Sequence, residues 1–150
     1  MENTDLDPEG SFIFCLELQE IEVAHFTECS GLKTSTTVFE IQEGGVNHML
    51  HKMPGQSTWD NIVLRYGVTS SVDLVEWRSE VMDDSKTLED SLRNGAIVVK
   101  NNRMDVVRRY DFRNAWPVSW EGPQLTADAS EVAVEVLEIA HHGIVISTGS

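Results

Sequence analysis

The chain has 150 residues, a hydrophobic fraction of 41% and a formal net charge of −14, from 11 basic and 25 acidic residues. This length is enough for one domain with its own core, and we expect a single domain over residues 1–150. The acidic charge argues against a nucleic-acid-binding protein, because phosphate groups attract the opposite sign. No run approaches the roughly 20 apolar residues of a membrane-spanning helix, so we expect no direct membrane anchor.

Both ends of the chain are expected to be loosely held. Residues 1–10 are acidic and lack the basic-then-apolar pattern of a signal peptide, which predicts a flexible N-terminal tail and synthesis in the cytoplasm. Residues 144–150 are expected to form a soft C-terminus. The two cysteines, Cys15 and Cys29, are interpreted as free buried thiols, as is usual in cytoplasmic proteins.

Alternation of apolar and polar residues predicts strands along most of the chain. Gly31 follows the first two strands and can adopt the positive φ that a turn requires. A long hairpin is expected next, with Gly44–Gly45 at its tip and a turn at Pro54–Gly55 after it. The predicted strands cover residues 11–18, 21–26, 36–43, 46–52, 62–66, 96–100, 105–112 and 131–140.

One segment changes its period from two to that of a helix. Leu74, Trp77 and Val81 recur at i, i+3 and i+7, which predicts an amphipathic helix at about residues 71–83. Trp77 is interpreted as the core anchor of this helix. The polar segment 83–93 is expected to be a loop.

The most aromatic stretch of the sequence follows the last predicted hairpin. Residues 108–113 alternate as a strand does, and Pro117 then removes a backbone donor, so the strand is expected to end there. Trp116 and Trp120 are large apolar side chains beside this turn. We interpret both as core anchors that contribute about 2–3 kcal/mol each by burial.

The final predicted strand has one apolar face and one polar face. Val132, Val134 and Val136 are expected to face the core. This arrangement places Glu131 and Glu135 on the opposite face, in contact with water.

No combination of residues indicates an enzyme, a cofactor or a metal. His48 and His51 lie in the predicted hairpin tip without a further ligand at suitable spacing, and the adjacent His141 and His142 point to opposite faces of a strand. Motifs for a nucleophilic serine, a phosphate loop or a dinucleotide are absent from the sequence. We therefore expect no catalytic residue, no cofactor and no metal site.

Two other classes of function stay open on these residues. One is a free carbohydrate- or ligand-binding β-sandwich module, in which Trp59, Trp116 and Trp120 would be stacking platforms. The other is a hydrolase that uses acidic pairs, for which no arrangement of residues is visible. Particle size separates both from a self-assembling protein, because a module or an enzyme runs as a small species.

A series of short motifs, each weak alone, is specific in its order and spacing. They lie at residues 28–32, 43–47, 52–55, 62–69, 113–117, 120–123, 131–135 and 137–141, with the Trp77 helix between the fourth and the fifth. In this order the chain resembles, along nearly its whole length, the tail-tube family of contractile phages and of phage-tail-like contractile injection systems.

The resemblance implies a mainly β fold, a sandwich or barrel of two packed antiparallel sheets with one flanking helix. It implies that six copies form a ring and that rings stack into a hollow conduit, which contraction of a surrounding sheath drives through a target envelope. The implied partners are further copies of the chain, the sheath protein, baseplate, spike and tube-initiator proteins, and an effector or DNA as cargo. The protein would be made in the bacterial cytoplasm and act in the assembled particle.

Two surfaces receive roles from this resemblance. The hairpin is expected to join subunits, since its edges need partners, and the polar face of the last strand, with Glu131 and Glu135, is expected to line the lumen. The alternatives are an adaptor or initiator ring of the same apparatus and the tube protein of type VI secretion. Of the two kinds of apparatus in the family, we favour an injection system over a phage. The expected assembly residues are Thr37, Phe39, Ile41, Glu43, Gly44, Gly45 and Asn47.

Overall fold

A computed structural model of the chain describes residues 11–42, 50–68, 71–127 and 133–149. Within these ranges the chain forms ten strands and two helices, so the mainly β fold is confirmed. No helix in these ranges has the length and apolar character needed to cross a bilayer. The elements are β1 (Ile13–Leu18), β2 (Ile21–Phe26), β3 (Glu28–Ser30), β4 (Thr34–Gln42), β5 (Leu50–Trp59), β6 (Ile62–Gly67), α1 (Asp73–Met82), α2 (Leu88–Ser91), β7 (Arg93–Lys100), β8 (Val106–Glu121), β9 (Val134–Ala140) and β10 (Ile144–Thr148).

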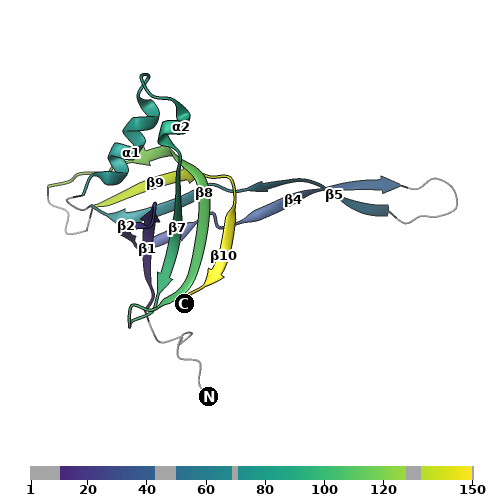
Figure 1. Cartoon of the computed structure of the whole chain (residues 1–150), viewed down its shortest axis with the longest axis horizontal. Helices are drawn as coiled ribbons and strands as arrows, with labels where there is room; N and C mark the ends of the chain where they lie inside the picture. Colours follow the sequence, from purple (N-terminus) through teal and green to yellow (C-terminus); the bar gives the residue numbers. More distant parts are fainter. Residues whose placement is uncertain (1–10, 43–49, 69–70, 128–132, 150) are drawn as a thin grey trace, which may run out of the picture.

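Eight strands form one antiparallel sheet that folds into two layers (Figure 1). The long strand β8 belongs to both layers, because its first half pairs with β7 and β10 and its second half pairs with β9. Apolar side chains from both layers meet between them and form the core. This cluster includes Leu16, Ile97 and Phe112 from the first layer and Ile62, Leu64, Leu137 and Ile139 from the second.

The sheet closes on itself through β2 and β3. The strand order runs from β2 at one end to β3 at the other, and only Thr27 separates these two strands in the chain. The backbone N–H of Thr27 donates to the carbonyl of Arg65 over 2.8 Å. One segment of chain therefore pairs with β1 on one side and with β6 on the other.

The predicted long hairpin is present and extends away from the body (Figure 1). It differs from the prediction at its second strand, because β5 continues through Pro54–Gly55, where we expected a turn. Pro54 lies opposite Val38, next to a register shift in the hairpin, and such irregular positions tolerate the missing N–H of proline. Gly31 turns the chain into the hairpin with φ +91°, and a Cβ there would collide with the carbonyl oxygen of Asn61.

Pro117 does not end its strand, contrary to the prediction. Strand β8 continues to Glu121, and its register with β9 shifts between Pro117 and Ser119. At such an irregular position the strand pairing does not need the backbone N–H that proline lacks, as at Pro54. The bend between the two halves of β8 lies near Asn114, which has φ +49°.

Trp77 holds helix α1 on the body. Its side chain is 2% exposed, and its Nε1–H donates to the carbonyl of Ser91 over 2.7 Å. The guanidinium of Arg93 lies over the indole at 5.6 Å and pairs with Glu80 at 2.9 Å. These contacts tie α1 to the start of β7.

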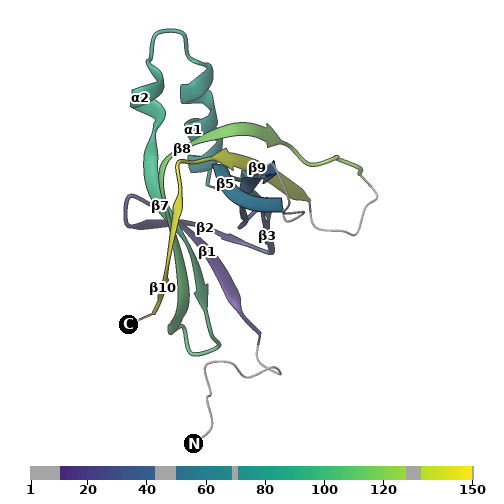
Figure 2. The same ribbon diagram turned by 90° about the vertical axis from the view of Figure 1, so that its right-hand side faces the viewer.

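The expected loop 83–93 contains a second, short helix. Figure 2 shows α1 and α2 side by side at one end of the molecule. The carboxylate of Asp90 accepts the backbone N–H of Thr87 over 3.1 Å, which satisfies a donor at the start of α2. Sequence periodicity misses a helix of one turn because it contains too few residues to show a period.

Three further expectations are corrected by the structure. Trp120 is 36% exposed and is therefore not a core anchor. Trp116 is half-buried and is not one of the residues of the core cluster. The segment Ile144–Thr148 is not a soft end but strand β10, which pairs with β8 from Phe112 to Arg108. Its residues are mostly exposed, so their pattern contained no sign of a buried face.

Replacing Trp77 by alanine should lower the free energy of unfolding by about 3–5 kcal/mol, because a large buried side chain and its hydrogen bond are lost. Met82→Ala on the same helix is the matched control, since Met82 is 60% exposed, and it should change the free energy by less than about 0.5 kcal/mol. Urea denaturation of the two variants measures both effects. Equal stabilities would mean that Trp77 does not anchor the helix.

Candidate assembly surfaces

The hairpin presents an apolar face that nothing in the described part of the chain covers. Cross-strand pairing places Phe39 opposite Met53 and Ile41 opposite His51, so these side chains share one face. Phe39 is 58% exposed, Ile41 51% and Met53 49%. Thr37 lies on the same strand two residues before Phe39 and is also exposed.

The opposite face of the hairpin mixes apolar and charged side chains. Val38 is 56% and Leu50 51% exposed, and Glu40 lies opposite Lys52. In the described ranges β4 and β5 pair only with each other, so each has an outer edge with unpaired backbone groups. Exposed apolar residues on open strand edges are typical of a surface that another chain covers.

The structure describes only part of the predicted assembly set. Thr37, Phe39 and Ile41 lie together on the exposed apolar face. The other four, Glu43, Gly44, Gly45 and Asn47, lie outside the described residues.

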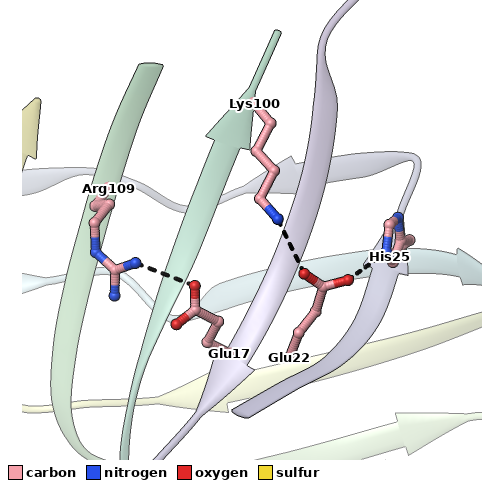
Figure 3. A network of polar contacts seen from close by, with 5 residues as sticks. All are labelled: Glu17, Glu22, His25, Lys100 and Arg109. Atoms are coloured by element: carbon pink, nitrogen blue, oxygen red, sulfur yellow. Dashed lines mark hydrogen bonds and ion pairs between the residues drawn. The ribbon is translucent and has the colours of Figure 1, made fainter. Parts of the chain in front are cut away.

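A row of paired charges covers the outer face of the first layer (Figure 3). The ammonium of Lys100 lies 3.1 Å from a carboxylate oxygen of Glu22. Arg109 lies 3.1 Å from Glu17 and 3.3 Å from Asp111. The row crosses β2, β1, β7 and β8, so it links strands that are far apart in the sequence.

Hydrogen bonds from Lys100 and His25 hold the pKa of Glu22 below its usual value. Beneath this carboxylate lies the thiol of Cys15, which is fully buried. Burial and the charge of Glu22 raise the pKa of Cys15. Among the described residues, Cys15, Glu22 and His25 are the one group whose donor atoms lie close enough together to hold a metal, within 4.8 Å of one another.

A cleft of about 480 Å³ lies beside the charged row. Trp59, one of the three tryptophans expected as stacking platforms in a ligand-binding module, lines this cleft. Trp116 and Trp120 are not among its lining residues. The indole of Trp59 also contacts His141, with ring centroids 5.9 Å apart. Other lining residues are Glu17, Arg109, Asp111, Arg113 and Ile144.

The face assignment predicted for the last strand is wrong. Leu137 and Ile139 are the buried residues of β9, and Glu135 shares their side of the strand. Val134 lies on the other side and is 38% exposed. Glu135 is therefore not on the face opposite the core, and Glu131 and Val132 lie outside the described residues.

Glu135 instead contacts side chains of its own chain. Its carboxylate accepts the Nε1–H of Trp120 over 3.3 Å. Burial, followed by the nearby charge of Glu135, raises the pKa of Tyr66. The apolar side chains that follow Glu135 along β9 could have predicted this face, because Leu137 and Ile139 are larger than the valines.

The sequence matches the family model described as T4-like virus tail tube protein gp19 over residues 10–145. No curated protein sequence matches the chain significantly.

Solved structures from contractile injection systems have a similar fold. A chain of the sheath-tube complex of an extracellular contractile injection system in its extended state is 23% identical, with a TM-score of 0.78 over 99% of both chains. A chain of the anti-feeding prophage baseplate is 22% identical, with a TM-score of 0.77 over 99% of this chain and 98% of that one. A chain of the tube-terminating cap of the same prophage is 26% identical, with a TM-score of 0.77 over 99% and 95%.

Replacing Glu22 by glutamine should lower the free energy of unfolding at pH 7 by about 0.5–1 kcal/mol, as expected for a partly exposed pair. The pKa of Glu22 is lowered in the folded state. Its stabilisation is therefore present above the unfolded pKa of about 4.3 and disappears as the pH falls through the folded value. The difference in stability between the variant and the wild type should therefore be smaller at pH 3 than at pH 7.

Urea denaturation at both pH values measures this difference. Glu28→Gln is the matched control, since its pair with Arg65 is longer, at 3.4 Å, and more exposed, and it should change stability less. A Glu22→Gln difference that is the same at both pH values would contradict a role for the charge.

Proposed function

The chain belongs to the T4-like virus tail tube protein family, and from this membership we propose that it is the subunit of the inner tube of a contractile injection system. Six copies form a ring, and the rings stack into a hollow conduit. Contraction of a sheath around the tube drives it through the envelope of the target cell. The protein is a structural component and not an enzyme.

The exposed hairpin is the observation that supports this proposal most directly. A β4–β5 hairpin with Phe39, Ile41 and Met53 about half exposed is unfavourable for a free monomer, because apolar side chains and unpaired edges both face water. Pairing with a neighbouring subunit buries the side chains and supplies strand partners. A closed ring does this for every subunit at once.

The partners follow from the same role. The similar chains come from a sheath-tube complex, a baseplate and a tube-terminating cap. We propose that this tube likewise contacts a sheath protein on its outside and baseplate, spike and initiator proteins at its end. The subunit is made in the bacterial cytoplasm and acts in the assembled particle.

The charge of the chain suits a conduit. A net charge of −14 per subunit, repeated around each ring, repels acidic molecules and keeps them from adhering to the wall. An effector protein or DNA is the proposed cargo. We favour an effector, and hence an injection system rather than a phage, because the similar structures come from injection systems.

The double variant Phe39→Asp/Ile41→Asp should prevent assembly while leaving the subunit folded. Both side chains are more than half exposed in the single chain, so their replacement should change the free energy of unfolding by only about 0.5 kcal/mol. In an interface between chains, the two introduced aspartates would be buried as unpaired charges, which is strongly unfavourable. Negative-stain microscopy and light scattering should find rings or tubes for the wild type and monomers for the variant.

Glu40→Gln, between the two sites on the opposite face, is the control and should still assemble. Rings that form normally from the double variant would contradict the assembly role of this face. A wild type that stays monomeric at high concentration, even with partner tube proteins, would contradict the tube itself. Wild-type rings that never stack would instead indicate an adaptor ring.

A further inference from the structure

A register shift in the first hairpin brings together three side chains that the sequence separates. Cys15 pairs with His25, but the register between β1 and β2 slips after Leu16, so that Glu17 pairs with Glu22. In a regular strand Glu22 and His25, three residues apart, would lie on opposite faces. The shift places both on the face of Cys15.

The residues at the shift show how this works. Between the pairs Leu16–Ala24 and Glu17–Glu22, Val23 is the extra residue on β2. Val23 and Ala24 both pack against the core, although they are neighbours in the chain. A bulge of this kind re-aims the following side chains, and such bulges occur next to functional sites. Here it directs Glu22 outward, above the thiol of Cys15.

The three side chains offer one sulfur, one oxygen and one nitrogen donor. The Nε2 of His25 lies 2.5 Å from Oε1 of Glu22, and the three donor atoms all lie within 4.8 Å of one another. Ligand atoms around a tetrahedral zinc ion lie about 3.3–3.8 Å apart, given bonds of about 2.0–2.3 Å. Glu22 and His25 are exposed at 39% and 56% of their side chains, so they can make this small adjustment.

We propose that Cys15, Glu22 and His25 form a binding site for a divalent transition-metal cation of the Zn²⁺ type, with water as the fourth ligand. Thiolate, imidazole and carboxylate together fit zinc and its neighbours, whereas Mg²⁺ and Ca²⁺ require oxygen ligands. The site would clamp β1 to β2 on the outer face of the first layer. This inference is independent of the tube function.

Protons and charges balance in this step. Metal binding replaces the proton on the sulfur of Cys15, which goes to solvent, and His25 binds through Nε2 with its proton on Nδ1. The two anionic ligands then neutralise the ion. Because binding releases this proton from Cys15, affinity rises with pH. The ammonium of Lys100, 3.1 Å from Glu22 (Figure 3), opposes the cation and competes for this carboxylate.

Titration of the full-length protein with Zn²⁺ by calorimetry, in two buffers of different ionisation enthalpy, tests the site. We expect one ion per chain and about one proton released. Co²⁺ as a second probe should give a thiolate-to-metal absorption band in the near ultraviolet. His25→Ala and Glu22→Gln should each weaken binding by about tenfold or more, and Lys100→Gln should strengthen it severalfold.

Two control variants test whether the metal binds at this site rather than at another histidine or thiol of the chain. Cys29→Ser and His142→Ala should leave binding and the cobalt band unchanged, whereas Cys15→Ser should abolish the band. Cys15 is fully buried, so if its variant does not fold, the exposed His25 and Glu22 variants decide the question. Absence of stoichiometric binding, a cobalt spectrum without the thiolate band, or binding unaffected by His25→Ala would overturn the proposal.

Discussion

Closure of the main sheet is the constraint on which the rest of the body depends. One short segment, interrupted only at Thr27, pairs with β1 through β2 and with β6 through β3. Both ends of the sheet thereby lie in one continuous segment, and the core lies between two layers that this segment joins. The β4–β5 hairpin is outside this closure, which is why its edges and apolar side chains stay exposed.

The body and the hairpin therefore have different physical roles. The body is stabilised by its own core, to which Trp77 joins the helical layer through Ser91 and Arg93. The hairpin makes few contacts with the body, and in the proposed tube its apolar side chains are covered by other copies of the chain. Such a division would let a subunit fold before it assembles, because the proposed assembly surface is not part of the core.

Register shifts decide which side chains reach each surface. The shift after Leu16 turns Glu22 outward beside Cys15 and His25, and the shifts near Val38 and Pro117 let prolines lie within strands. Each shift is a local change of one residue with consequences along the rest of the strand. The ion pair between Glu22 and Lys100 and the proposed metal site both depend on the shift after Leu16.

The sequence by itself determined the mainly β class, the Trp77 helix, the long hairpin and the family, because alternation, helical spacing and motif order are local properties that survive in the printed chain. It did not determine which face of β9 meets the core, that β8 continues through Pro117, or that residues 144–148 form a strand. Nor did it bring Cys15, Glu22 and His25 together. These features depend on register and on the partner of each edge. Register and edge partners are decided by contacts between residues far apart in the chain, and these contacts exist only in the tertiary structure.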